Sequence, residues 1–370
     1  MVRPRLGIAR RLIKASVAAM TLTVAVPPGW TRVAAAAEPP APASAPATAG
    51  STQEPVRGRT SLMDAAWRGR IDVVERLLAQ QAEVDAVDAE GGTALLLAAE
   101  AGHVGITRLL LAAGARPSVR AKAGHTPLVA AAREGHGAIV RELLKIATAD
   151  DDRDSALGLA ASGCFDATVE ALLAAQVAID VADTLGRTPL MRAARTCDGR
   201  LVDMLRHRGA NLAAVDGEGR TALWHAADQA NRAAVEHLLA LGAPIDSADK
   251  AGETALMRAL MRGDVTSARH LLAKGADPNR GNRSSNTPLM IAARLSQTDG
   301  VVALLKASAK VNARNSNGYS ALMLAAQAGH PQIVKMLVAA GADRGLRNTK
   351  RETARDIAVA AGHAGIPEQL

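Results

Sequence analysis

Apolar residues recur along this chain in short blocks that follow a Thr or a Ser at a nearly constant spacing. A block such as residues 126–132 (TPLVAAA) alternates with a second kind of block such as residues 109–115 (LLLAAGA). The first kind starts at Thr60, Thr93, Thr126, Ser155, Thr188, Thr221, Thr254, Thr287, Ser320 and Thr353. Every step is 33 residues, except for a step of 29 from Thr126 to Ser155. One unit cannot bury its own apolar face, so the pattern predicts stacked units.

Each unit is predicted to contain two helices and a turn. The Thr caps the first helix, a Pro fits its first turn, and an Ala pair lets neighbouring backbones approach closely. A glycine such as Gly102, Gly135 or Gly329 ends this helix. The second helix supplies paired leucines to the core and ends at Gly114, Gly209, Gly242, Gly275 or Gly341. An extended turn, such as residues 84–92, leads to the next unit.

This unit resembles the ankyrin repeat, whose period is 33 residues and whose T-P-L-H-x-A signature matches at every position but the His. That position holds Met63, Leu96, Val129, Gly158, Met191, Trp224, Met257, Met290 and Met323. The resemblance covers about residues 56–363, and its last unit is similar to a truncated C-terminal cap. It implies an all-α solenoid of about ten helix-turn-helix units with short β-hairpin tips. The array should span 56–370, with an irregular unit near 145–155 and a cap from 350.

The resemblance also implies a concave face, formed by first helices and hairpin tips, that holds a partner protein. Its variable positions give these candidates: Trp67, Arg68, Arg133, Glu134, Arg187, Arg195, Arg220, Trp224, Asp228, Arg262, Arg294 and Tyr319. Aromatic and Arg residues dominate interface hot spots, which favours Trp67, Trp224, Arg195, Arg262 and Tyr319. The alternative for each one is an ordinary solvated side chain. Fold alone does not identify the partner.

Five methionines share one repeat position: Met63, Met191, Met257, Met290 and Met323. Methionine serves adaptable binding surfaces, but it also fills irregular gaps in cores. Core packing is the favoured interpretation of this row.

A run of aspartates lies within the step of 29 residues between Thr126 and Ser155. Asp150, Asp151, Asp152 and Asp154 stand where a hairpin is expected, so the array should bend or lose hydrogen bonds there. Four carboxylates could attract a cation, but they lack the spaced, glycine-turned pattern of an EF-hand loop. We therefore expect a solvated acidic loop.

Cys164 and Cys197 are 33 residues apart and occupy the glycine position that ends the first helix in adjacent units. An oxidising compartment would favour a disulfide between them. Stacked helices, however, lie roughly 8 to 10 Å apart, whereas a disulfide needs Cα atoms within about 7 Å. The spacing argues against a disulfide unless the loops are distorted.

The N-terminus has the layout of a secretory signal peptide. Basic residues precede an apolar stretch at 15–26, and small residues precede Glu38, so cleavage is expected near Ala37. The stretch is shorter than the roughly 20 residues that span a membrane, so a permanent anchor is the less favoured alternative, and we expect no stable membrane insertion after cleavage. Arg10-Arg11 allows either a twin-arginine route or simple n-region charge. Residues 38–55 are Ala/Pro-rich and predict a flexible linker.

The net charge of +8 does not indicate nucleic-acid binding. Residues 1–37 contain six basic residues and no acid, so the remainder has 38 basic and 36 acidic residues. The histidines of the Gly-His pairs, His103, His136, His330 and His363, are repeat residues. No metal-binding, phosphate-binding or nucleophile motif occurs, so we expect no catalytic site, cofactor or metal.

These features predict a non-catalytic protein-protein interaction module, monomeric and located in the periplasm or secreted. It would bind an unknown protein through its concave face and tips. The alternative is a secreted effector whose array binds a host protein.

Overall fold

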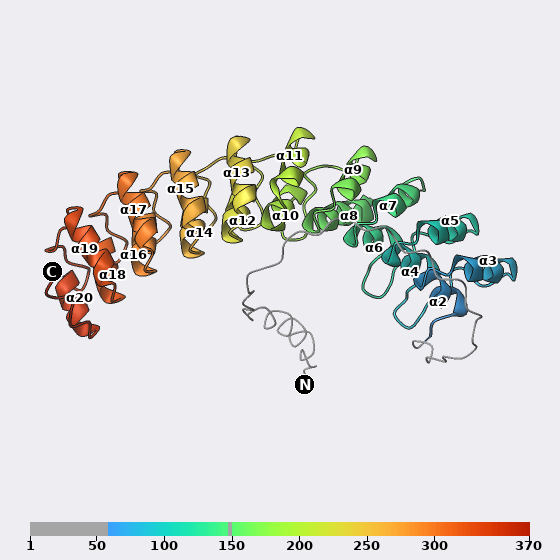
Figure 1. Ribbon diagram of the computed structural model, residues 1–370, viewed down its shortest axis with the longest axis horizontal. Helices are drawn as coiled ribbons and strands as arrows, with labels where there is room; N and C mark the ends of the chain where they lie inside the picture. The colour runs from blue at the N-terminus through green and yellow to red at the C-terminus, as the bar shows by residue number, and fades with distance from the viewer. Residues whose placement is uncertain (1–57, 147–149) are drawn as a thin grey trace, which may run out of the picture. The chain divides into compact units, whose positions relative to one another are not determined.

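The computed structural model describes residues 58–146 and 150–370, where helices follow one another in pairs (Figure 1). The first helices of the units are α2 (Ser61–Trp67), α4 (Ala94–Ala101), α6 (Pro127–Arg133), α8 (Asp150–Ser162), α10 (Pro189–Thr196), α12 (Ala222–Asp228), α14 (Ala255–Met261), α16 (Pro288–Arg294), α18 (Ala321–Gln327) and α20 (Ala354–Ala360). The second helices are α3 (Ile71–Ala79), α5 (Val104–Ala112), α7 (Gly137–Leu144), α9 (Asp166–Ala174), α11 (Gly199–His207), α13 (Arg232–Ala240), α15 (Val265–Ala273), α17 (Thr298–Lys306) and α19 (Pro331–Ala339). The last unit has only α20, followed by turns. The predicted all-α solenoid is confirmed.

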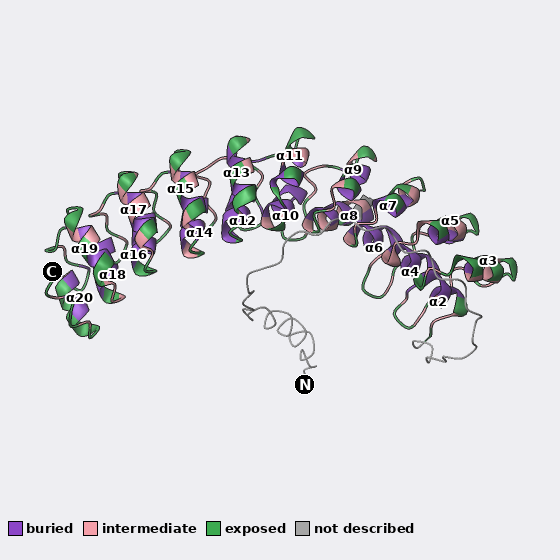
Figure 2. Cartoon of the chain, viewed as in Figure 1, coloured by how far each residue is buried: buried purple, intermediate pink, exposed green. Residues whose placement is uncertain are grey.

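The helices form two layers. First helices pack on first helices from α2 to α20, and second helices pack in the runs α3 to α9 and α11 to α19. Between α9 and α11 no comparable contact occurs, so the second layer is weakest there. Figure 2 shows buried residues along the first helices and exposed residues at the outer ends of second helices such as α13 and α15. The core therefore lies within and between the units.

Threonine or serine caps nine first helices by accepting a hydrogen bond from the backbone N–H three residues later. These caps are Thr60, Thr93, Thr126, Thr188, Thr221, Thr254, Thr287, Ser320 and Thr353. Gly102 ends α4 in the left-handed conformation, with φ 84°. The sequence therefore predicted the start of these nine helices and the end of α4 correctly.

The tips between units are turns held by Asp or Asn side chains. In each, a side-chain oxygen accepts the backbone N–H groups two and four residues later; the residues are Asp88, Asp183, Asp216, Asp249, Asn282, Asn315 and Asn348. Within 58–146 and 150–370 the only strand-like pairing is an isolated bridge between Ala248 and Thr254. The expected hairpins are therefore reduced to turns, which we call tips.

The repeat histidines connect neighbouring units. The Nε2 atoms of His103, His136, His330 and His363 each lie 3.1 Å from the carbonyl oxygen of the residue 36 positions earlier. That carbonyl is at the end of the preceding unit's first helix, where no helical N–H can reach it. Asn231 and Gln297, at the same repeat position, donate side-chain amides to the carbonyls of Ala194 and Leu260, which lie 37 positions earlier and one residue before the carbonyl that the histidines contact.

Replacing His136 tests this link between units. His136→Leu is expected to lower the free energy of unfolding by about 1 kcal/mol, because the Glu100 carbonyl loses its donor. His136→Gln should lower the free energy of unfolding much less, since the side-chain amide of Gln297 donates to a carbonyl of the preceding first helix elsewhere in the chain. Urea unfolding of both variants checks this. Equal losses would show that only the volume of the ring matters.

The methionine row packs in the core. Met63, Met191, Met257, Met290 and Met323 are each at most 1% exposed. The favoured interpretation of the row is confirmed.

The acidic stretch forms a helix, so the expected solvated loop is wrong. Residues 150–154 are the first residues of α8, and Asp152 is buried and 2.8 Å from the guanidinium of Arg120. Carboxylates in the first turn of a helix interact favourably with its dipole. Arg153 also stands where the tips have glycines with positive φ, such as Gly186 and Gly219. The chain therefore forms helix in place of a tip.

Cys164 and Cys197 form a disulfide with Cα atoms 5.3 Å apart, contrary to the spacing argument. The distance between packed helix axes does not limit the distance between these two Cα atoms, because both cysteines lie in loops beyond their helices. Cys164 adopts a positive φ of 60°, and Cys197 is extended with φ −90° and ψ 160°. Asp198, not a histidine, caps the next helix, and its carboxylate cannot donate to a carbonyl. Thr196 Oγ1 donates instead to the equivalent carbonyl, that of Ser162, at 3.0 Å. The disulfide thus connects the two units beside a hydrogen bond that a different residue supplies.

The predicted signal peptide, residues 1–37, and linker, residues 38–55, lie outside the described residues. None of the described helices has both the length and the apolar character needed to cross a membrane.

Candidate functional site

The sequence-predicted candidates lie on one side of the array, which we call the tip face: the first helices together with the tips that precede them. The structure divides them into an apolar groove near the C-terminus, a central polar network and an N-terminal group. Their exposure and their ion pairs decide which of them can meet a partner.

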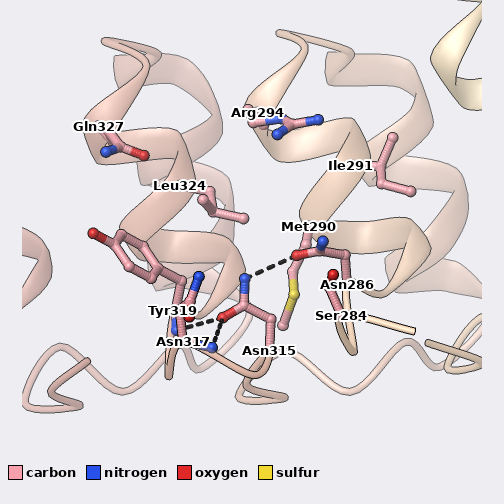
Figure 3. A pocket seen from close by; sticks show the side chains of 10 residues that line it. All are labelled: Ser284, Asn286, Met290, Ile291, Arg294, Asn315, Asn317, Tyr319, Leu324 and Gln327. Carbon is pink, nitrogen blue, oxygen red and sulfur yellow. Dashed lines mark hydrogen bonds between the residues drawn. The ribbon is translucent and has the colours of Figure 1, made fainter. Parts of the chain in front are cut away.

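The groove lies between α16 and α18 and has a volume of about 330 Å³ (Figure 3). Its lining comprises Ser284, Asn286, Met290, Ile291, Arg294, Asn315, Asn317, Tyr319, Leu324 and Gln327. The side chains of Met290, Ile291 and Leu324 are less than 10% exposed and form an apolar floor. Methionine and branched aliphatic side chains of this kind favour an apolar side chain from a ligand.

The rim of the groove is polar and held in place by the tips. The Asn315 side chain accepts the backbone N–H groups of Asn317 and Tyr319 and donates to Asn286 Oδ1 at 2.8 Å. Figure 3 shows these amides below the groove, with Arg294 and Gln327 at the other end of the two helices. The amide groups and Tyr319 can form hydrogen bonds with an extended peptide.

Arg294 is the one charged side chain of this lining. It is exposed, and no carboxylate of the described residues lies within ion-pair distance of its guanidinium. A guanidinium binds a carboxylate through two parallel hydrogen bonds. The groove therefore combines an apolar floor with a free cation at one end.

The other predicted arginines are mostly paired within the protein. Arg187 binds Asp183 at 2.9 Å, Arg220 binds Asp216 at 2.8 Å, and Arg262 binds Asp228 at 2.9 Å. To meet a partner, each would have to share or lose its carboxylate. Arg195 is half-buried on α10 and forms no ion pair with any residue that the structure describes.

Trp224 is not an exposed contact residue, which corrects the sequence prediction. It is 6% exposed because it occupies the same repeat position as the buried methionines. Its ring lies 5.3 Å from the guanidinium of Arg220 and 4.7 Å from that of Arg258. Two cation-π contacts therefore hold it in place within the array.

The central network joins the tips to the first helices. Asp216 accepts hydrogen bonds from Arg220 at 2.8 Å and lies 2.9 Å from His225 Nε2. Burial lowers the pKa of His225, although the Asp216 carboxylate opposes this. Burial also raises the pKa of Asp216, but backbone and side-chain donors outweigh it and hold the pKa below its ordinary value. At neutral pH, these two shifts keep Asp216 charged and His225 neutral.

Asp228 is also buried, so it stabilises the array and is not exposed to a partner protein. It accepts hydrogen bonds from both Arg258 and Arg262. Burial raises the pKa of Asp228, but these two guanidinium groups outweigh it and lower the pKa. Arg262 itself remains exposed at the edge of the network.

The N-terminal group is more accessible. Trp67 is 39% exposed, with the Arg59 guanidinium 5.6 Å from its ring centre. Arg68 pairs with Asp64 at 2.7 Å, and Arg133 pairs with Glu100 at 2.6 Å and Glu134 at 2.9 Å. Trp67 is thus the one aromatic candidate largely open to solvent.

The apolar side chains at the floor of the groove and the asparagine side chains at its rim were not predicted from the sequence. Ile291 and Leu324 follow the methionine position, where α10, α12 and α14 have Arg192, His225 and Arg258. This change from polar to apolar along one repeat position was the signal available. The closing of the groove by Asn315 required the structure.

Among the described residues, no group of three or more His, Cys, Asp or Glu side chains is arranged to hold a metal ion. The repeat histidines His103, His136, His330 and His363 are engaged in the contacts between units described above.

A family model described as three copies of the ankyrin repeat matches residues 62–152, 198–282, 223–315 and 280–348. These matches cover more than half of the chain; residues 153–197, which include most of α8 and the disulfide, lie outside them. No curated protein matches the chain significantly. Ankyrin repeats serve as protein-protein interaction modules and are generally non-catalytic. The chain belongs to the ankyrin-repeat family.

Proposed function

We propose that this protein is a non-catalytic module of the periplasm that binds a partner protein through the tip face, with the groove between α16 and α18 at the centre of the contact. The observation that carries the proposal is the unpaired Arg294 beside the apolar floor of Met290, Ile291 and Leu324. The partner would place an apolar side chain on this floor and a carboxylate against Arg294. Interfaces are typically dominated by a few such central residues.

Two further observations support the proposed location. The first is the signal-like layout of residues 1–37. The second is the disulfide, since disulfides persist in oxidising compartments such as the periplasm and are rare in the cytosol. A secreted effector that binds a host protein would share both features, so fractionation of cells must separate the two functions.

Cross-linking of the tagged protein in its own cells, followed by mass spectrometry, tests the proposal. We expect a specific exported partner, a mature N-terminus near residue 38 and protein retained in the periplasmic fraction. Accumulation in the medium would favour the effector. An intact N-terminus with no captured protein would contradict the proposal.

Charge reversal at the groove gives a quantitative test with the captured partner. Arg294→Glu is expected to weaken binding at least tenfold, because a carboxylate would then face the partner's carboxylate. Lys335→Glu on α19 makes the same change in charge on an exposed second-helix residue and should leave binding unchanged. Titration of the partner by calorimetry measures both. Equal losses for the two variants would indicate only a general charge effect.

A further inference from the structure

The tips are connected by a regular ladder of backbone hydrogen bonds. The N–H of Gly217 donates to the Leu185 carbonyl at 2.9 Å, and that of Lys250 donates to the Glu218 carbonyl at 2.8 Å. The same bond recurs at Lys122, Arg283, Ser316 and Thr349, each with the tip before it. Each tip therefore offers one carbonyl on one edge and one N–H on the other.

This ladder is interrupted once, at α8. By the register of the other tips, the Ala123 carbonyl and the Thr184 N–H should bond to a tip between them. That tip is replaced by the first turns of α8. Among the residues that the structure describes, neither group has a backbone hydrogen bond to a neighbouring tip. Both residues are exposed, so the two edges remain open.

A cavity of about 630 Å³ occupies the place of the missing tip. Gly124 and His125 line one side, Thr184 and Arg187 line the other, and Gly158 and Leu159 form the floor. Gly158 stands at the repeat position where five other units have a buried methionine, so the floor is lower here than elsewhere. The volume is within the range of protein sites that hold ligands.

The cavity presents little net charge. Arg120 pairs with Asp152 at 2.8 Å, and Asp183 pairs with both Arg187 and Arg192. The buried Nε of Arg192, which lies above Gly158, has no hydrogen-bond partner in the described part of the chain. The groups open to a ligand are thus the two backbone edges, which suits a polar but nearly neutral segment.

We propose that this cavity binds an exposed turn of a partner protein, of the Asp/Asn-x-x-Gly type, which takes the place of the missing tip. The turn would donate an N–H to the Ala123 carbonyl and accept the Thr184 N–H, as a tip does throughout the ladder. Addition of backbone segments to open edges is a general mode of peptide recognition. A second copy of this chain is a poor occupant, because each of its tips from 88–92 to 348–352 already has a bonded neighbour.

This site is separate from the groove between α16 and α18 and does not depend on the proposed function. The two can be distinguished because Arg294→Glu affects only the groove. Binding at the cavity would add a second point of contact at the irregular unit.

A cyclic peptide that copies residues 181–188 (VADTLGRT) is a suitable probe, because it carries the Asp-x-x-Gly turn and has no net charge. We expect the labelled peptide to bind the full chain in fluorescence polarisation and to slow amide hydrogen exchange at Thr184. Gly158→Met should weaken binding at least tenfold by filling the floor. A Cβ at residue 158 lies 3.3 Å from Arg192 Nε, the flexible end of a side chain, so the variant should fold.

Thr184→Pro removes the edge donor and should also abolish binding, whereas Thr184→Ala keeps the N–H and should bind normally. Thermal unfolding confirms that each variant is folded, and a scrambled cyclic peptide and Arg294→Glu serve as controls. Lack of binding at about 1 mM peptide would overturn the proposal. Equal binding to the Gly158→Met and wild-type chains, equal binding of the scrambled peptide, or exchange protection at the groove instead of Thr184 would overturn it as well.

Discussion

Loss of the Cys164–Cys197 disulfide is expected to destabilise the array by about 3 to 4 kcal/mol, the chain-entropy value for a closed loop of this length. The two residues are 33 positions apart. The junction that they join is weak in one other respect, because α9 and α11 make little contact in the second layer. Repeat arrays are stabilised through contacts between neighbouring units. Without the disulfide, we therefore expect unfolding to separate into two transitions at this junction.

A double Cys164→Ala, Cys197→Ala variant tests this without leaving a free thiol. Circular dichroism during urea unfolding should show a lower first midpoint and a broader transition than in the oxidised wild-type chain. Reductant should change the wild-type chain in the same way and leave the double variant unaffected. If the double variant unfolds at the wild-type midpoint in a single transition, the units are held by helix packing alone.

The regular part of the fold could be predicted because its signals are local. A Thr that caps, a Pro at the first turn and an Ala pair act within one helix, so repetition of this pattern predicted the first helices. Thr221 accepts the N–H of Trp224 as the pattern requires. The same repetition led correctly to the buried methionines, since one environment recurs in each unit.

The errors occur where residues from different units decide the structure. The residues of the acidic stretch, taken alone, predicted a loop. In the structure they form the first turn of α8, and Asp152 pairs with Arg120, which lies next to the preceding tip. Cys164 and Cys197 appeared too far apart because the sequence does not show that Cys164 adopts a positive φ in the loop beyond its helix. Nor does it show that Asp198, which cannot donate a hydrogen bond, caps the next helix. Trp224 was assigned to the surface by its aromatic character, although its repeat position is buried.

The candidate site was only partly accessible to sequence reasoning for the same reason. Arg294 and Tyr319 were among the predicted candidates, and both line the groove, while their contact with a partner stays a prediction. Arg68, Arg187 and Arg220 pair with a carboxylate four residues away, which the sequence could have suggested. Arg133 and Arg262 pair with Glu100 and Asp228 of the preceding unit, which it could not. A repeat pattern gives the position of each side chain but not its ion pairs.

Acid is expected to remove about 2 kcal/mol of stability through Asp183 alone. Burial raises the pKa of this carboxyl, but the backbone N–H groups of Arg187 and Leu185 and the guanidinium groups of Arg187 and Arg192 outweigh it and lower the pKa to about 2. A depression of this size below the ordinary value of 3.8 corresponds to about 2 kcal/mol. Because the folded-state pKa is the lower one, this stability is fully present above about pH 5. It is lost as the pH falls towards 2.

The Asp183→Asn variant isolates this effect, because Asn282, Asn315 and Asn348 hold equivalent tips by the same backbone hydrogen bonds. It should be about 2 kcal/mol less stable than the wild-type chain at pH 7, since a neutral amide loses the charge that strengthens the backbone hydrogen bonds and pairs with Arg187 and Arg192. The difference should shrink steadily below pH 5, as protonation removes the same charge from the wild-type chain. Asp72→Asn removes an exposed carboxylate of α3 and should differ little from wild type at pH 7. Urea midpoints at a series of pH values measure both differences, and a constant difference for Asp183→Asn from pH 7 to about pH 3 would show that its pKa is not depressed by folding.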